Sequence, residues 1–171
     1  EQIDEIPWGE PFDLVGITVM TATAPRAYEL CARVRARAIP VVLGGFHVTF
    51  NVEEAARHAS AVVVGPAGGA WPDALADLES GALKAVYHGN PDHPVPVALP
   101  RHLLNRSGYV SVQTCTATTG CANRCAFCSI TAFYQGRRYR QPIDAIVAHL
   151  RSFDDRFFLF VDDNLTQDRD Y

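Results

Sequence analysis

Three short apolar segments, one containing a glycine and two directly followed by one, most constrain what this chain can fold into. Residues 12–20, 41–43 and 61–64 are rich in valine, isoleucine and leucine. Such β-branched runs are typical of strands that are buried on both faces of a parallel sheet. The intervening residues 26–38 and 51–57 have the spacing of amphipathic helices. This alternation predicts an α/β fold class, with a partial Rossmann-like parallel sheet.

Weaker signals extend this pattern on both sides of the third strand. Asn51 followed by Glu54 resembles a capping box and predicts that a helix begins there. A helix is also predicted over residues 71–78 and an edge strand over residues 85–88. Ligands of parallel α/β sheets bind at the carboxyl ends of the strands. In this chain those ends are residues 16–22, 44–47 and 65–69.

Residues 89–104 have a different composition from the segments on either side. Four prolines fall within them, without helical or strand periodicity. Proline-rich segments of this kind form extended, semi-rigid linkers. We therefore predict a first domain at residues 1–88 and a second at residues 105–171.

The second domain has the pattern strand, loop, helix, strand. Strands are predicted at residues 109–115 and 157–161, the latter buried, and a helix at residues 142–152. The apolar face of that helix is predicted to be Ile143, Ile146, Val147 and Leu150. This order is the beginning of a (β/α) barrel, which takes roughly 200 residues or more. We therefore expect a fragment of a longer protein, truncated at both ends.

Charge and cysteine content restrict the compartment and the partners. The net charge of −4 provides no basic surface for nucleic acid. No apolar run approaches the roughly 18 residues of a membrane span, and the N-terminus does not resemble a signal peptide. The five cysteines are odd in number and unevenly spaced, which favours metal ligation in a reducing cytoplasm over disulfides.

Three of these cysteines form the strongest motif in the sequence. Cys121, Cys125 and Cys128 have C-x3-C-x2-C spacing on one loop. Thiolates so close together can bind one iron–sulfur cluster, and three ligands for four irons leave one iron open. A structural zinc site would need Cys115 or His102 as fourth ligand, and neither spacing is typical.

This spacing, with Phe127 directly before the last cysteine, resembles the radical SAM superfamily. The resemblance implies that the three cysteines hold a 4Fe–4S cluster and that S-adenosylmethionine (SAM) chelates the fourth iron. Reduction by a donor such as flavodoxin or ferredoxin would then cleave SAM to a 5′-deoxyadenosyl radical. That radical abstracts a hydrogen atom from the substrate. Phe127 is expected to lie near the adenine.

Two polar segments near this motif are further candidates. Asp162, Asp163 and Asn164 follow the last predicted strand, where the superfamily holds the SAM ammonium group. The alternative is that Asp163 or Asn164 caps the next helix or turn. An arginine- and tyrosine-rich segment, residues 134–140, can reach an acidic group of SAM, substrate or cobalamin, or it can be a solvated basic loop.

The first domain also carries a recognisable pattern. Gly16-x-Thr18-x-Met20, followed by Gly44-Gly45, resembles the cobalamin-binding domains related to methionine synthase. The resemblance implies that Thr18 faces the nucleotide tail of cobalamin and that the two glycines allow close approach.

Two further residues near the same rim leave open questions. Gly65 is expected to approach the cobalamin, but the acidic residue that follows it in many relatives is absent. The D-x-H-x-x-G segment with the cobalt-binding histidine is not in this chain, so axial ligation stays open. His47 lies near the rim, but a lone histidine there is more often structural.

The order of these segments resembles the cobalamin-dependent radical SAM class. It implies methyl transfer to an unactivated carbon of an unknown small-molecule substrate. One alternative is a radical SAM enzyme whose Rossmann domain does not hold cobalamin and which performs another radical reaction. The other is a fragment that binds cofactors but is catalytically inactive.

Overall fold

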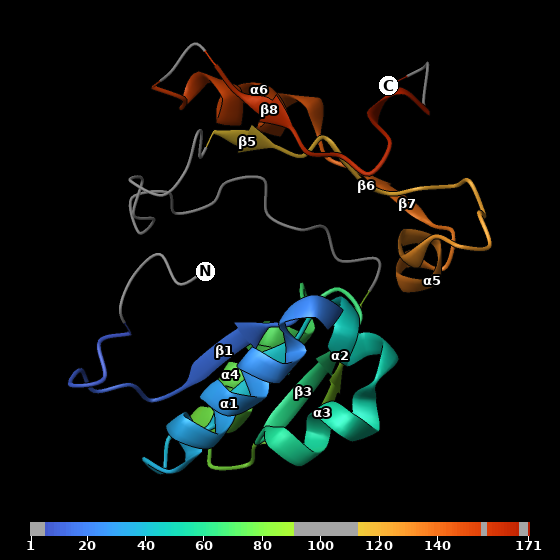
Figure 1. Cartoon of the computed structure of the whole chain (residues 1–171). Helices are drawn as coiled ribbons and strands as arrows, with labels where there is room; N and C mark the ends of the chain where they lie inside the picture. Colours follow the sequence, from blue (N-terminus) through green and yellow to red (C-terminus); the bar gives the residue numbers. More distant parts are fainter. Residues whose placement is uncertain (1–5, 91–112, 155–156, 168–170) are drawn as a thin grey trace. The chain divides into compact units, whose positions relative to one another are not determined.

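A computed structural model describes residues 6–90, 113–154, 157–167 and 171 (Figure 1). Two compact units divide the chain, one within residues 9–93 and one that includes residues 113–171. From residue 91 onward the predicted linker lies outside the described residues, as does most of the strand predicted at residues 109–115. No helix in the described ranges is long and apolar enough to cross a membrane.

The first unit is built on a four-stranded parallel sheet. Its strands are β1 (Val15–Thr18), β2 (Val41–Gly44), β3 (Ala61–Val64) and β4 (Val86–His88), in that order across the sheet. β2 and β3 are buried along most of their length. The predicted strands and the α/β fold class are confirmed.

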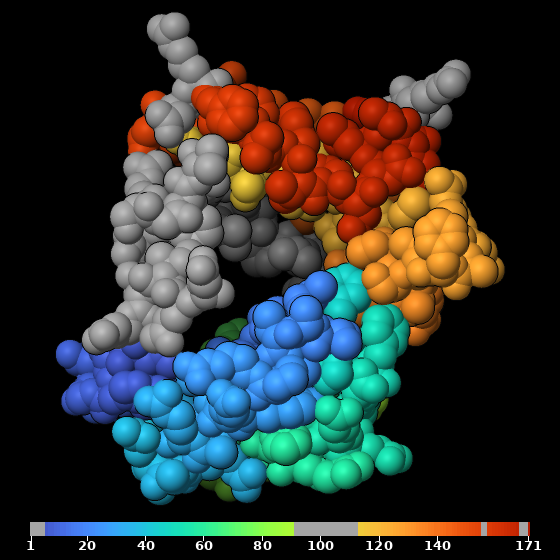
Figure 2. All heavy atoms as spheres, viewed as in Figure 1, coloured from blue at the N-terminus to red at the C-terminus, as the bar shows by residue number. Residues whose placement is uncertain are grey.

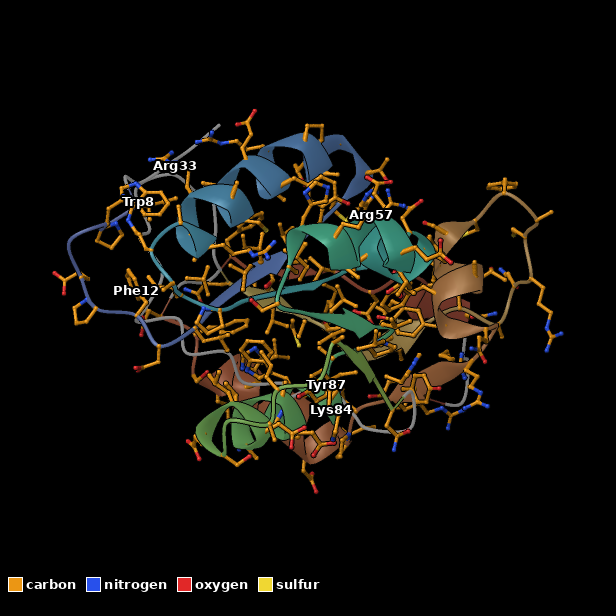
Figure 3. All side chains as sticks on the ribbon, turned by 90° about the horizontal axis from the view of Figure 1, so that it is seen from below. Trp8, Phe12, Arg33, Arg57, Lys84 and Tyr87 are labelled. Carbon is orange, nitrogen blue, oxygen red and sulfur yellow. The ribbon has the colours of Figure 1, made fainter. Side chains whose placement is uncertain are left out.

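Helices cover both faces of this sheet. A 3-10 turn, η1 (Thr21–Thr23), leads into α1 (Ala24–Arg35), which is followed after β2 by α2 (Phe46–Phe50) and α3 (Val52–His58). These three helices lie on one face, and α4 (Ala70–Glu79) lies on the other (Figures 1 and 3). In Figure 2 residues of α1, in blue, and of α2 and α3, in teal, lie at the surface of the first unit.

The interior of the first unit consists mainly of small and β-branched side chains. On one face Ala70 and Ala74 of α4 pack against Val42, Val63 and Tyr87 of the strands. On α1 the buried residues include Ala27, Cys31 and Val34, as its periodicity predicts. Alanines on the helices let the backbones approach the sheet closely, because they present only a methyl group.

The capping box predicted at Asn51 is wrong. Its side chain makes no cap hydrogen bond to α3. Instead Asn51 Nδ2 donates to the carbonyl of His47, 3.0 Å away. The reason is α2, which the sequence analysis did not predict. This one-turn helix ends directly before α3, and its last carbonyls need donors.

The second unit has two strand pairs. β5 (Thr114–Cys115) and β8 (Leu159–Phe160) are parallel, whereas β6 (Thr118–Gly120) and β7 (Arg138–Arg140) are antiparallel. Its helices are α5 (Ser129–Tyr134), α6 (Ile143–Arg151) and the 3-10 turn η4 (Leu165–Gln167). The β5-α6-β8 segment is one βα unit, and the barrel that it would begin stays a prediction.

The predicted buried strand at residues 157–161 is shorter and more exposed than expected. Only Leu159 and Phe160 pair with β5, and the side chains from Phe157 to Val161 are 37–59% exposed. Within the described residues no strand pairs with the other edge of β8. On α6 Ile146 is buried as predicted, but Ile143 is 55% exposed.

We predict that Tyr87→Phe destabilises the first unit by about 1–2 kcal/mol, measured by chemical denaturation. The Tyr87 hydroxyl accepts from the Lys84 backbone N–H and donates to the Asp77 carboxylate, both at 2.9 Å (Figure 3). Phenylalanine would leave both groups without this partner. As a control, Glu29→Gln removes only the exposed ion pair with Arg26 and should change stability by less than about 0.5 kcal/mol. Equal losses of stability in the two variants would contradict the stabilising role of the Tyr87 hydroxyl.

Candidate functional site

The carboxyl ends of the first three strands surround a cavity of about 270 Å³. Its lining includes Gly16, Thr18, Gly44 and Gly45, together with Trp71 of α4. Three of the four residues predicted to hold cobalamin therefore border one space, namely Thr18, Gly44 and Gly45. Sequence reasoning missed Trp71, although it begins the predicted helix at residues 71–78.

Glycines shape this cavity in two different ways. A Cβ on Gly44 would lie 3.8 Å from the Val63 Cβ, an ordinary contact distance, so glycine keeps space open there. Gly45 has φ of +99°, and its Cβ would lie 2.9 Å from the carbonyl oxygen of Val19. Only glycine fits this backbone, and the turn after β2 depends on it.

Gly65 has a structural contact beside the cavity and is not among its lining residues. Its backbone N–H donates to the Thr49 hydroxyl at 2.9 Å, and that hydroxyl donates to the Gly45 carbonyl at 2.9 Å. Thr49 therefore links the loop after β2 to the loop after β3. Threonine in a helix commonly donates its hydroxyl to the carbonyl four residues earlier, as Thr49 does to Gly45. The bond from Gly65 to Thr49, in contrast, requires the fold to bring these residues together.

His47 is buried in the first unit and has polar partners on both ring nitrogens. Nε2 lies 3.0 Å from the Tyr28 hydroxyl and 3.6 Å from Glu54, and Nδ1 lies 3.4 Å from Thr21 Oγ1. Burial and the neighbouring Glu54 carboxylate raise the pKa of Tyr28 to about 12. The imidazole therefore joins α1 to α2 and α3, in agreement with the structural role favoured by the sequence.

In the second unit the cysteine loop is closed at its base. β6 leads into the loop and β7 follows it, with Gly120 paired to Arg138. Gly120 has φ of +81°, and its backbone N–H donates to the Asp163 carboxylate at 2.7 Å. The loop thus leaves and re-enters an antiparallel strand pair, which limits how far its cysteines can separate.

The three thiols differ in their surroundings. Cys121 and Cys128 are half-buried, whereas Cys125 is exposed and Phe127 is 92% exposed. Hydrogen bonds from the backbone N–H groups of Thr131 and Ile130 lower the pKa of the Cys128 thiol. In the described part of the chain, no three His, Cys, Asp or Glu side chains are gathered as a preformed metal site.

Asp162, Asp163 and Asn164, the predicted SAM contacts that follow β8, all lie against β6 and the cysteine loop. Asp162 accepts hydrogen bonds from the backbone N–H groups of Ala117 and Thr118 and from the Thr118 hydroxyl. Asp163 accepts from Gly120, and Asn164 Nδ2 donates to Cys121 Sγ at 3.6 Å.

Part of the arginine- and tyrosine-rich segment is a strand, which sequence periodicity did not predict. Arg138, Tyr139 and Arg140 form β7. The Arg140 guanidinium lies 5.5 Å from the centre of the Tyr171 ring, a cation–π distance. Contacts of these arginines with an acidic group of SAM, substrate or cobalamin stay a prediction.

Comparison with known proteins finds a similarity in the first unit. Residues 1–75 match the family model of the B12 binding domain. Gly16, Thr18, Gly44, Gly45 and Gly65 all fall in the matched range. The α/β fold and the resemblance inferred from the glycine pattern agree with this match.

Two curated relatives extend the comparison beyond this domain. The bacteriochlorophyllide d C-8(2)-methyltransferase of Chlorobaculum tepidum is 36% identical over 154 residues, which cover 85% of this chain and 34% of that protein. The bacteriochlorophyllide d C-12(1)-methyltransferase of the same organism is 30% identical over 168 residues, which cover 91% and 37%. The chain thus spans about a third of the length of either relative.

Among solved structures, the N-terminal domain of a hypothetical protein of Thermotoga maritima is similar to this chain. The match covers 52% of this chain and 77% of that one, at 21% identity and a TM-score of 0.40.

We predict that Gly120→Ala destabilises the second unit by about 2–4 kcal/mol, because the positive φ is strained and the added Cβ would overlap the Arg137 carbonyl oxygen. Gly136→Ala is the matched control. Its φ of +69° is also positive, but its Cβ would meet only the flexible Arg124 side chain at 3.2 Å. The difference in stability between the two variants is measured by hydrogen exchange of the β6 and β7 backbone amides during denaturation. If both variants cost the same, the close approach of Gly120 to Arg137 is not a constraint.

Proposed function

We propose that this chain holds the cofactors of a cobalamin-dependent radical SAM methyltransferase. One observation carries the proposal: a segment that matches the B12 binding domain model, residues 1–75, precedes a closed C-x3-C-x2-C loop in the same chain. The alignments to two methyltransferases cover 85% and 91% of the chain, so they must extend well beyond residue 75. Both parts therefore have counterparts in proteins named as methyltransferases.

In the proposal the first unit binds cobalamin at the carboxyl edge of its sheet. The cavity there is lined by glycine backbone and by apolar groups of Ile17, Val42, Val63 and Trp71. An apolar, glycine-lined space fits a planar base, because the base can lie against backbone and indole without displacing side chains. Thr18, which also lines the cavity, has a hydroxyl that can bind a polar group of the ligand.

The second unit would hold a 4Fe–4S cluster through Cys121, Cys125 and Cys128. The donor set fits, because thiolates are the usual ligands of such clusters and backbone N–H groups already favour the thiolate of Cys128. When bound, the cluster would supply the electron for reductive cleavage of SAM, and cobalamin would carry the methyl group. The exposed Phe127 remains available to contact the adenine of SAM.

The proposal leaves defined tasks to residues near the loop. Asp162 and Asp163 accept hydrogen bonds from backbone N–H groups of β6 and keep the loop base in place. A SAM contact by Asp162, Asp163 or Asn164, and electron transfer from a flavodoxin or ferredoxin, belong to the proposal. The names of the two relatives make a bacteriochlorophyllide the first substrate class to test.

Anaerobic reconstitution with iron and sulfide tests the cluster. We predict about four irons per chain, and loss of the cluster in Cys125→Ala, because three thiolates are needed to hold it. Cys31→Ala is the control, since this buried cysteine lies on α1 in the first unit and should leave iron binding unchanged. Iron binding by Cys125→Ala at the wild-type level would refute the cluster assignment.

Absorbance titration with cobalamin tests the first unit. We predict that Gly44→Ala weakens binding about tenfold or more, because a methyl group would enter the cavity while its contact with Val63, at 3.8 Å, leaves the fold intact. Gly9→Ala, at a position with no atom within 4 Å of the added Cβ, should bind as the wild type does. Unchanged affinity in Gly44→Ala would place the ligand elsewhere.

A further inference from the structure

The segment that follows β8 holds successive residues of the cysteine loop. Asp163 accepts from the Gly120 backbone N–H at 2.7 Å, and Gln167 Oε1 accepts from the Ala122 backbone N–H at 3.1 Å. Gln167 Nε2 also donates to Asn123 Oδ1 at 3.1 Å. We call residues 162–167 the loop clamp. It holds the loop on both sides of Cys121.

Asn164 occupies the middle of the loop clamp and reaches the cysteine itself. Its Nδ2 lies 3.6 Å from Cys121 Sγ, and both residues are half-buried. A thiolate can only accept hydrogen bonds, so the amide nitrogen and not the amide oxygen faces the sulfur. The larger radius of sulfur accounts for a distance longer than that of an N–H···O bond.

We propose that Asn164 is a positioning residue that donates a hydrogen bond to the Cys121 thiolate and thereby raises the reduction potential of the cluster. The inference rests on the proposed function, because it requires a cluster on Cys121. It assigns Asn164 a role that does not depend on SAM.

The physical reason is the charge on the sulfur. Reduction adds one electron to a cluster whose thiolate ligands are already negative, and hydrogen bonds to these sulfurs are among the factors that set the potential. An N–H donor stabilises the more negative, reduced state more than the oxidised state. In a half-buried position this effect is stronger than it would be in water. Partners of metal ligands commonly tune a site in this way.

The competing role of Asn164, a contact to SAM, makes a different prediction. A residue that acts only on SAM leaves the potential unchanged while SAM is absent, and its loss lowers SAM affinity. A donor to Cys121 shifts the potential without SAM. The two roles are therefore separated by measuring the cluster alone.

The experiment is an anaerobic redox titration of the reconstituted full chain without SAM, monitored by electron paramagnetic resonance. Asn164→Leu has a similar shape but no donor, and we expect a midpoint potential below that of the wild type. Asn164→Asp places a carboxylate near the sulfur, and we expect a larger downward shift. Gln167→Met is the comparison variant: it removes two hydrogen bonds to the loop but none to a sulfur, so we expect faster cluster loss at the wild-type potential.

Each outcome decides a specific claim. An unchanged midpoint in Asn164→Leu, or an equal shift in Gln167→Met, overturns the inference and leaves the proposed function standing. Unchanged potential with reduced SAM affinity in Asn164→Leu assigns the residue to SAM. Failure of the wild-type chain to take up iron and sulfide overturns the proposed function itself.

Discussion

Parallel hydrogen bonding between β1, β2 and β3 is the constraint on which the first unit depends. It places Thr18 opposite Gly44 and ends all three strands at one edge of the sheet. Residues that are far apart in sequence therefore border one cavity. Helices cover both faces of the sheet, so this edge is where a ligand can reach the backbone. The location of the candidate site follows from the topology of the sheet and not from any single side chain.

In the second unit, too, the candidate site is held in place by paired strands. The β6–β7 pair closes the base of the cysteine loop, and the carboxylates of Asp162 and Asp163 after β8 accept hydrogen bonds from backbone N–H groups of β6. Because the paired strands β6 and β7 hold the two ends of the loop, Cys125 and Phe127 can stay exposed without loss of the loop's position. The cysteines are thus presented on a fixed base, which suits a site completed by a metal cluster.

Local sequence patterns were enough to predict the strands of the sheet. The features that they did not predict depend on contacts between residues far apart in the sequence, or on elements too short to show a pattern. The strands at residues 41–43 and 61–64 were predictable because buried β-branched runs have few other uses. The helix α2 was missed because one turn carries too little periodicity. Exposure of residues 157–161 was missed because an apolar run indicates a strand but not which neighbours cover it. The hydrogen bond from the Gly65 backbone N–H to Thr49 could not be predicted either, because the two residues are brought together only by the fold. This bond links the loop after β3 to the loop after β2.

In the candidate sites, too, local patterns predicted some residues, whereas contacts between distant residues could not be predicted. Their spacing made the three cysteines candidate cluster ligands, and the glycine pattern made Thr18, Gly44 and Gly45 candidate cobalamin contacts. The structure places the latter three around one cavity. The contact between Asn164 and Cys121 joins residues 43 positions apart, so no local pattern could predict it.

The central claim is that one chain carries both cofactors. Elemental analysis of the anaerobically reconstituted chain, after incubation with cobalamin and gel filtration, tests it most directly. The account predicts about four irons and about one cobalt in the same chain. Iron without cobalt, cobalt without iron, or zinc in place of iron would contradict it.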